Sequence, residues 1–402
     1  MQAGRKPEFS YLCSDEPENM LLIASLLTCV YCLLTLFLWF HWRSIRYFYP
    51  AREHKPPDRV SVIIPVRNEA ANIQQLLADL DRQCWPDGTP FSDAQLEVIV
   101  VDDDSEDATA SLVEDYTAHR FSLRLLRLDV SAGFTGSHKK LALSQAIRQA
   151  GGEGIITTDG DCRVQPQWIA HILSFMSCQN LVLVSGPVTF GCEKNLFDRL
   201  QTIEFASLIG TGAACMQAGA PNMCNGANLA FRRSAFERVE GYAGSMHIPS
   251  GDDEFLLQKI FRQYPGQLAF LKNREAVVQT RAQPDLRGFY YQRKRWAGKW
   301  KLHKKLSTAA LALLIFGFHA TLITTALMTM AGSFPLSLFL GILLAKGAVE
   351  FLLLDTVLRN MDKKLHIVNF VLLQLIYSAY AVFFGIVANF GGYQWKARRY
   401  AA

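Results

Sequence analysis

Two nucleotide-binding signatures are missing from this sequence of 402 residues. No G-x-G-x-x-G follows the first strand-like run, so a dinucleotide-binding fold is unsupported. No G-x-x-x-x-G-K-S/T occurs either, which excludes the P-loop proteins. A nucleotide site in this chain must therefore use other residues.

Cysteine patterns that bind metal are also missing. The nine cysteines are odd in number and show no array with the spacing of metal ligands. Cys29 and Cys32 form a C-x-x-C inside a long apolar run, where apolar packing explains them better than redox or zinc chemistry. This usage fits a reducing compartment.

The sequence has a small excess of positive charge, which is concentrated in a few segments. The formal net charge is +5, and it comes largely from basic clusters at 41–55 and 292–305, which flank long apolar runs. Such flanking charge is typical of membrane proteins. We therefore expect a membrane partner and no nucleic acid.

Long apolar runs predict a membrane protein with several helices. Residues 20–40 carry no charge, are long enough to cross a bilayer and precede no signal-cleavage site, so we expect a retained transmembrane helix over 20–41. Later runs predict about three more within 307–391; they are 308–334, 335–357 and 367–390. The basic clusters place the region between these helices, and with it any catalytic domain, in the cytoplasm.

The run 335–357 carries Lys346, Glu350 and Asp355. Charges at bilayer depth are costly, so we expect these side chains to face protein rather than lipid. Lys346 and Glu350 are four residues apart and can pair on one helix face, either as a packing pair or along the path of a substrate. Three full spans at the C-terminal end would leave the basic stretch 395–400 outside, against the positive-inside bias, unless the last segment is re-entrant or interfacial.

The region between the apolar runs predicts an α/β fold with a mainly parallel sheet. Four strand-like runs alternate with helix-like runs, and such alternation gives a sheet covered on both faces. The strands are expected near 59–66, 96–102, 123–130 and 154–158, and the helices near 71–83, 111–120 and 138–150. In these sheets ligands bind outside the carboxyl ends of the strands.

Acidic residues gather where these strands end. Asp159 and Asp161 flank Gly160 directly after the fourth strand, and two carboxylates this close repel each other unless a cation lies between them. A hard divalent ion that also binds phosphate oxygens meets this need, and the glycine lets the backbone turn close to a ligand. On these residues alone, a solvated turn remains the alternative.

Six motifs extend this pattern, and together they resemble family 2 glycosyltransferases. In order they are VSVIIPVRNE, VIVVDDDSEDAT, ITTDGDC, GANLAFRRSAFERVEGY, GDDEFL and QRKRW. The resemblance covers residues 59–300 and is greatest to the membrane-embedded branch with cellulose, chitin and hyaluronan synthases and ceramide glucosyltransferase. It implies a GT-A fold over 55–285, inverting transfer and a nucleotide-diphosphate-sugar donor.

The resemblance assigns the donor site. Pro65, Arg67 and Glu69 lie at the nucleotide-facing end of the first strand, and Asp103 contacts the base or ribose. Lys139 lies near the nucleotide, although His138 stands where the family has glycine, so the register between Lys139 and its neighbour Lys140 stays open.

The resemblance also assigns the metal and the catalytic base. Asp159 and Asp161 bind a divalent metal, Mg²⁺ or Mn²⁺, and Asp159 also faces the diphosphate. Asp253 matches the general base that takes a proton from the acceptor hydroxyl. Asp252 stands where glutamate is usual, which leaves the base open to this neighbour.

Two further motifs are implied on the acceptor and donor sides. Gly226 and Asn228 are expected on the acceptor side. The donor side includes the QRKRW residues Gln292, Arg295 and Trp296, which share one helix face. The competing interpretation of 286–306 is an interfacial helix. Both could hold, with Arg293, Lys294 and Lys299 facing lipid headgroups.

The sequence thus predicts a membrane-bound glycosyltransferase that transfers a hexosyl group to a lipid, lipid-linked or polysaccharide acceptor. A tail at 1–19 and a basic tail at 392–402 complete the expected organisation. A lipid acceptor is favoured because about three C-terminal spans suit a polymer channel poorly. The alternatives are a nucleotidyltransferase and a non-catalytic membrane component of the same fold.

Overall fold

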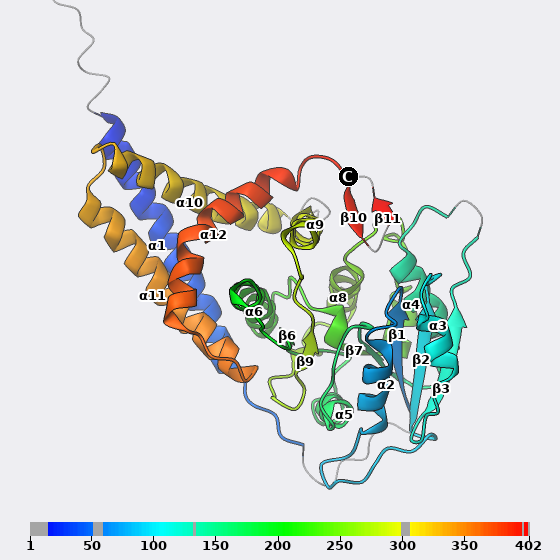
Figure 1. Cartoon of the computed structure of the whole chain (residues 1–402). Coiled ribbons are helices and arrows are strands. Elements are labelled where there is room, and N and C mark those ends of the chain that lie inside the picture. Colours follow the sequence, from blue (N-terminus) through cyan, green and yellow to red (C-terminus); the bar gives the residue numbers. More distant parts are fainter. Residues whose placement is uncertain (1–14, 51–58, 132–133, 299–305, 396–397, 401–402) are drawn as a thin grey trace, which may run out of the picture.

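The computed structural model describes residues 15–50, 59–131, 134–298, 306–395 and 398–400 (Figure 1). A seven-stranded sheet forms the centre of the domain at residues 59–298, which the sequence predicts to be catalytic and which is called the catalytic domain below. The strand order of this sheet is β3-β2-β1-β4-β7-β5-β8. Its strands are β1 Val60–Val66, β2 Leu96–Asp102, β3 Ser122–Arg127, β4 Gly154–Thr157, β5 Leu183–Ser185, β7 Leu229–Arg232 and β8 Leu268–Phe270. β7 runs antiparallel to both of its neighbours, and the other pairs are parallel. The predicted α/β fold with a mainly parallel sheet is confirmed.

Helices cover both faces of this sheet. They include α2 Ile73–Asp81, α3 Thr109–Glu114, α4 His138–Gln149, α5 Trp168–Cys178, α7 Arg233–Arg238 and α8 Asp252–Gln263. Every residue of β2 is buried, because an inner parallel strand has protein on both faces. A short parallel pair, β6 Val188–Phe190 and β9 Val278–Thr280, lies beside the main sheet.

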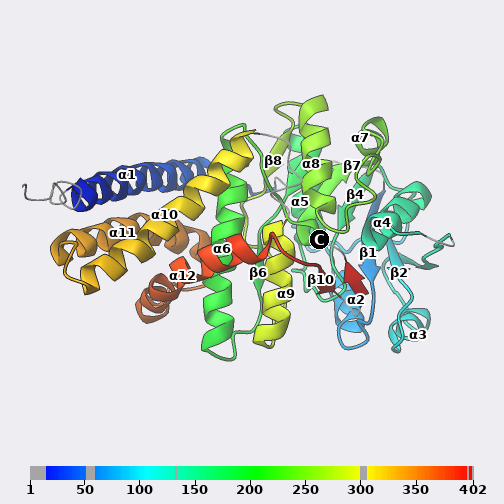
Figure 2. The same ribbon diagram turned by 90° about the horizontal axis from the view of Figure 1, so that it is seen from above.

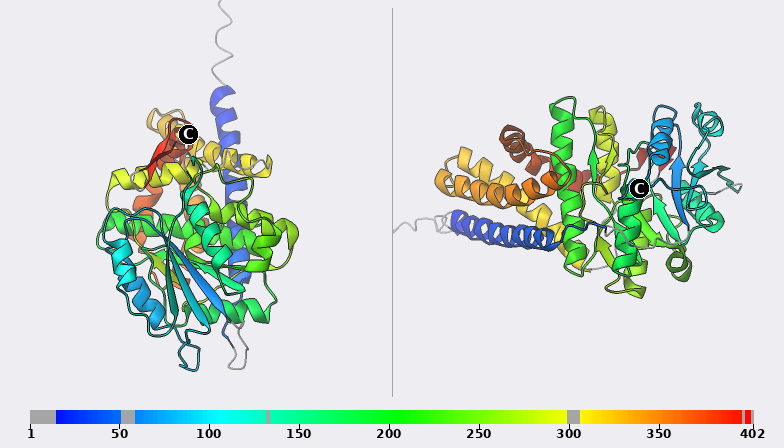
Figure 3. Two further views of the ribbon diagram at one scale, coloured as in Figure 1. Left: turned by 90° about the vertical axis from the view of Figure 1, so that its right-hand side faces the viewer. Right: turned by 90° about the horizontal axis from the view of Figure 1, so that it is seen from below.

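Two helices lie between the sheet and the long apolar helices. They are α6 Leu196–Gln217 and α9 Leu286–Ala297. Figures 2 and 3 show α6 between the sheet and the group formed by α1, α10, α11 and α12. The bounds of this group are α1 Asp15–Ser44, α10 Leu306–Met330, α11 Leu336–Asn360 and α12 Ile367–Val387. By length and composition, all four of these described helices could cross a membrane.

α1 is attached firmly to the catalytic domain at its C-terminal end. Trp42 is fully buried and packs edge-on against Phe270, with ring centroids 5.8 Å apart. Lys272 donates to the backbone carbonyl of Trp42 at 2.9 Å, which satisfies one of the carbonyls that a helix leaves without a partner at its end. The catalytic domain is therefore held against the end of the first apolar helix.

A polar network joins the apolar helices at mid-length. Lys346 is 1% exposed, and its ammonium lies 2.9 Å from the Glu350 carboxylate. Gln374 of α12 donates to Glu350 at 2.6 Å, and the hydroxyl of Tyr31 in α1 also donates to it. The expectation that these charges face protein rather than lipid is confirmed for Lys346 and Glu350. Asp355 pairs instead with Arg359 of the same helix at 2.8 Å.

Both ends of α12 lie at the catalytic domain. Just before the helix, Lys363 donates to the carbonyl of Gly191 at 2.6 Å. Near its end, Phe384 lies against Tyr290 of α9, with ring centroids 6.0 Å apart. Figure 1 shows α12 bent between these ends. This course favours the re-entrant or interfacial alternative over a further full span.

We predict that both ends of α12 face the same side of the membrane as the catalytic domain. In a background without the nine native cysteines, Asp362→Cys, Asn389→Cys and the domain reporter Asp93→Cys should react with an impermeant maleimide from one side. Ser333→Cys, in the exposed turn between α10 and α11, should react from the other. Labelling of positions 362 and 389 from opposite sides would show that α12 spans.

Candidate active site

A cavity of about 790 Å³ opens at the carboxyl edge of the sheet. Its walls come from the ends of β1, β2 and β4 and from α6, α8, α9 and α12. The volume is within the range of about 300–1,000 Å³ that is usual for ligand sites. All of the predicted site residues except Asn228 line this cavity.

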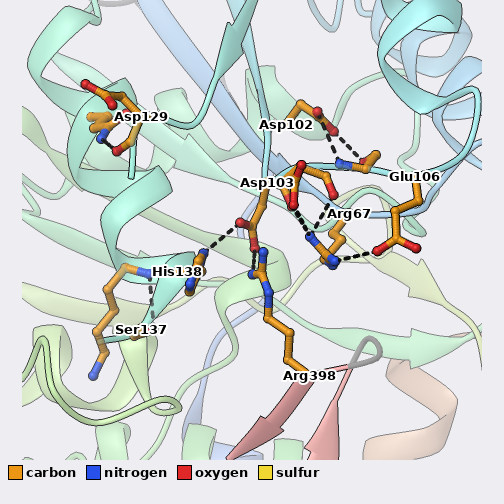
Figure 4. A network of polar contacts seen from close by, with 12 residues as sticks. Arg67, Asp102, Asp103, Glu106, Asp129, Ser137, His138 and Arg398 are labelled. Carbon is orange, nitrogen blue, oxygen red and sulfur yellow. Dashed lines mark hydrogen bonds and ion pairs between the residues drawn. The ribbon is translucent and has the colours of Figure 1, made fainter. Parts of the chain in front are cut away.

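Arg67 shapes the loop that follows β2. Its guanidinium donates to the carbonyls of Asp103 at 2.6 Å and Asp104 at 2.7 Å, and to the carboxylate of Glu106 at 3.0 Å (Figure 4). Arg67 is 7% exposed, so burial strengthens these bonds. The residue predicted to face the nucleotide thus also holds the neighbouring acidic loop in place.

The carboxylate of Asp103 contacts a histidine and an arginine from distant parts of the chain. His138 Nδ1 lies 2.8 Å from one carboxylate oxygen, and Arg398 donates to the other at 2.5 Å (Figure 4). Arg398 lies on β11 Arg398–Tyr400, which pairs with β10 Tyr393–Trp395. The C-terminal hairpin therefore reaches the predicted base or ribose side of the cavity.

The position of α4 resolves the register of the two lysines. The Lys139 ammonium lies 2.8 Å from the Asp159 carboxylate and 3.5 Å from that of Asp252. Lys140 is fully buried and donates instead to the carbonyls of Ser245 at 2.8 Å and Ile248 at 3.0 Å. Lys139 lines the cavity, while Lys140 holds a loop.

Lys139 is a fixed cation between two carboxylates. Burial by itself would lower the pKa of Lys139, but attraction to Asp159 and Asp252 outweighs burial and raises it well above its ordinary value. This charge compensates the carboxylates that repel each other at the sheet edge. A departing diphosphate would meet the same ammonium.

Asp159 and Asp161 supply ligands that suit a hard divalent ion. Both carboxylates line the cavity, and Thr280 donates to Asp161 at 3.1 Å. Among the residues that the structure describes, no group of three or more His, Cys, Asp or Glu could hold a metal. Carboxylate oxygens from one or two residues, completed by water and phosphate oxygens, are the usual set for Mg²⁺. The donor set therefore fits such an ion when substrate phosphates take part.

Packing alone requires a glycine at position 160. A β-carbon at this position would lie 2.8 Å from the Val66 side chain and 3.0 Å from that of Glu69. The β4 loop thus approaches the end of β1 closely at this position, and the expected close approach of the backbone to a ligand stays a prediction. The glycine thus brings the two strand ends together.

Asp252 and Asp253 begin α8, where the helix dipole favours negative charge. The Asp253 carboxylate accepts hydrogen bonds from the backbone N–H of Gly226 at 3.1 Å and of Glu254 at 2.8 Å. Asp252 instead lies beside the ammonium of Lys139. Gly226, predicted on the acceptor side, therefore orients the predicted base.

Asn228 does not line the cavity, and its predicted acceptor contact is wrong. The side chain is 1% exposed and donates to the carbonyls of Pro187 and Ala276, each at 2.8 Å. It also accepts from the indole of Trp168 at 3.0 Å. These bonds use both ends of the amide to join β7, α5 and the loops before β6 and β9, so Asn228 is structural.

α9 places Gln292, Arg295 and Trp296 in the cavity wall. The interfacial interpretation is wrong for Arg293, which is 2% exposed and pairs with Glu204 of α6 at 2.5 Å. It is also wrong for Lys294, which is buried, whereas Lys299 lies outside the described residues.

Several cavity residues were not predicted. Glu204 is one of two acids in α6, the other being Asp198, and Tyr377 and Tyr380 belong to a run interpreted as membrane-spanning. Arg398, counted as basic tail, contacts Asp103 but is not among the lining residues. A charged residue at position 204, within a mainly apolar helix, could have indicated a functional or paired side chain. No sequence pattern, however, predicts that its partner lies on α9. Lys346 and Glu350 are not among the lining residues, so their role as packing partners is favoured.

Comparisons with known proteins agree with this geometry. The family described as Glycosyl transferase family group 2 matches residues 154–388, and Glycosyl transferase family 2 matches residues 61–240. Glycosyltransferase AglE of Haloferax volcanii is 29% identical over 199 residues, which cover 48% of this chain and 58% of that protein. Poly-beta-1,6-N-acetyl-D-glucosamine synthase of Staphylococcus epidermidis is 27% identical over 192 residues, which cover 47% and 43%. The chain therefore spans about half the length of these relatives.

A solved structure shares the fold over most of both chains. It is the mannosyltransferase PcManGT from Pyrobaculum calidifontis, in complex with GDP-Man and Mn²⁺. The TM-score is 0.58 at 23% identity, with 92% of this chain and 97% of that chain covered. The likeness supports the GT-A fold.

The two lysines of α4 give a direct test of the site. Lys139→Met should lower the affinity for a nucleoside diphosphate at least about tenfold, because the cation beside Asp159 is lost. Lys140→Met should leave that affinity unchanged but lower the free energy of unfolding by about 1–3 kcal/mol, because two buried carbonyls lose their donor. Titration calorimetry and thermal unfolding measure the two effects, and the reverse pattern would refute the register.

Proposed function

The chain belongs to glycosyltransferase family 2, and we propose that it transfers a sugar from a nucleotide-diphosphate donor to a lipid acceptor at the membrane surface. Family membership removes the nucleotidyltransferase alternative. The acidic residues of the cavity, from the D-x-D to the start of α8, argue against a non-catalytic component. The observation that carries the lipid assignment is the apolar wall that α6 contributes to the cavity.

One face of α6 forms this wall. Its members recur at helical spacing and therefore share a face; they are Phe205, Leu208, Ile209, Gly212, Ala213 and Met216. Another part of the same helix meets α11, where a β-carbon at Gly210 would lie 2.7 Å from the Val357 side chain. α6 thus connects the catalytic cavity directly with the apolar helices.

The chemistry of the α6 wall favours a lipid over a growing glycan. Glu204 also lines the cavity from α6, but its carboxylate is bound by Arg293 and Tyr380, and the stripe itself carries no side chain that can hydrogen-bond. A glycan, by contrast, presents many hydroxyls that need partners. An acyl or isoprenoid chain gains about 25 cal/mol for each Å² of apolar surface that it buries there. Bound along α6, such a chain would bring its polar end toward α8.

The donor binds at the other side of the cavity in this proposal. Arg67, Asp103 and Lys139 face the nucleotide, and Asp159 and Asp161 would hold Mg²⁺ or Mn²⁺ with the diphosphate. When bound, the metal neutralises charge on the leaving diphosphate. Lys139 adds a cation at the same edge.

Asp253 is the proposed base. It accepts the proton of the acceptor hydroxyl as that oxygen attacks the anomeric carbon from the face opposite the diphosphate. Asp252 is less suited, because its carboxylate is already paired with the Lys139 ammonium at 3.5 Å. The N–H of Gly226 holds the Asp253 carboxylate in position. The basic clusters flanking α1 and α10 support a cytoplasmic location for this reaction under the positive-inside rule.

The acceptor class can be tested on the full chain in nanodiscs. Incubation with uridine- and guanosine-diphosphate sugars labelled in the sugar should give label that partitions into organic solvent and is identified as glycolipid by mass spectrometry. A water-soluble polymer as the labelled product would overturn the lipid assignment while leaving glycosyl transfer intact.

We predict that Asp253→Asn lowers turnover by about 10²–10⁴-fold and keeps donor binding, because a general base is removed. Asp252→Asn should cost less. Asp115→Asn, an exposed position outside the cavity, is the matched control and should be neutral. A dead Asp252→Asn beside an active Asp253→Asn would move the base by one position.

The metal prediction is separate. EDTA should abolish turnover of the wild type, Mn²⁺ or Mg²⁺ should restore it, and Asp161→Asn should require more metal for half-maximal activity, because one carboxylate ligand is lost. Full turnover in excess EDTA would refute a metal at the D-x-D.

A further inference from the structure

A buried ion pair lies in the cavity wall beside α12. Glu204 of α6 is 6% exposed and Arg293 of α9 is 2% exposed. Arg293 donates to the two carboxylate oxygens separately, from Nε at 3.2 Å and from Nη2 at 2.5 Å. The hydroxyl of Tyr380 in α12 donates to Glu204 at 2.9 Å. One carboxylate therefore joins three helices that line the cavity.

The guanidinium of Arg293 also packs against aromatic rings. It lies 4.3 Å from the ring centre of Trp296 and 4.6 Å from that of Phe289. On α6, Phe205 stacks with Trp296 at a centroid distance of 5.7 Å and an interplanar angle of 27°. Glu204 and Phe205 are adjacent, so α6 fixes both the cation beside Trp296 and the ring stacked on it.

Stability alone gives little reason to keep this pair. Two charges lose hydration when they are buried, and replacing a buried ion pair with apolar side chains of similar size is often neutral or stabilising. What the pair supplies is orientation, because a guanidinium bound by two parallel hydrogen bonds has a defined plane. The ring of Trp296 lies in the cavity wall and takes its position from that guanidinium.

We propose that Glu204 is a positioning residue for the acceptor. Through Arg293 it sets the ring of Trp296, and through Tyr380 it fixes α12 as a wall of the acceptor end of the cavity. Glu204 is not a proton acceptor in the reaction, since its oxygens are already bound by Arg293 and Tyr380. The inference rests on the proposed function, because it assigns the α6–α9–α12 end of the cavity to the acceptor. It therefore places the ring of Trp296 on the acceptor side, and not on the donor side that the family resemblance implies.

The test separates positioning from structural support. Glu204→Gln, Arg293→Lys and Tyr380→Phe are compared with Glu97→Gln in the full chain in nanodiscs. Glu97 is the matched control: it is 3% exposed, pairs with Arg124 at 3.3 Å and accepts from Ser61 at 2.7 Å, but lies outside the cavity. Each variant is measured for the KM of the acceptor that the wild type uses, for donor Kd and for Tm.

Glu204→Gln and Arg293→Lys should raise the acceptor KM about tenfold, equivalent to about 1.4 kcal/mol, and leave the donor Kd unchanged. Tyr380→Phe, which keeps both charges, should give a smaller rise in the same direction. Glu97→Gln should lower Tm without changing KM. The proposal is overturned if Glu204→Gln lowers only Tm, as the control does, or if Tyr380→Phe leaves KM unchanged when Glu204→Gln fails to fold.

Failure of the lipid assignment gives a different result. A wild type that transfers only to a glycan defeats that assignment, and the acceptor KM is then measured with the glycan. A rise in that KM still supports Glu204 as a positioning residue, and an unchanged KM still overturns it.

Discussion

The site depends on one electrostatic constraint: several carboxylates meet at the carboxyl edge of the sheet and need a positive charge between them. Lys139 supplies it by lying 2.8 Å from Asp159 and 3.5 Å from Asp252. Asp159 follows β4 and Asp252 begins α8, so a single ammonium links the proposed metal-binding loop to the helix that carries the proposed base. This mixture of charges suits the proposed substrate, a diphosphate accompanied by a divalent ion.

A second constraint is the attachment of this edge to the apolar helices. α6 lines the cavity with one face and meets α11 with another, while α12 begins and ends at the catalytic domain. In the proposed function, a membrane-embedded acceptor would reach the acidic edge along the apolar face of α6. Of the four apolar helices, α12 contributes Tyr377 and Tyr380 to the wall of the cavity.

The sequence predicted those features that depend on residues close together in the chain, such as strands and the acidic residues that follow them. Buried runs ending in acid predicted β1, β2 and β4, and the strand-end residues Asp103, Asp159 and Asp161 do line the cavity. Contacts between distant segments could not be predicted. Asn228 turns into the core because three separate segments saturate its amide, and Arg293 is buried because Glu204 lies on another helix. The bend of α12 and the reach of Arg398 also depend on tertiary packing, which hydropathy does not encode.

The most direct measurement of the central claim is a structure of the full chain with Mn²⁺ and a nucleoside diphosphate, using anomalous scattering to locate the metal. The account predicts one Mn²⁺ bound by Asp161 and phosphate oxygens, with the Lys139 ammonium moved from Asp159 toward the diphosphate. A nucleotide bound away from Asp159 and Asp161, or a metal that shares no ligand with the diphosphate, would contradict it.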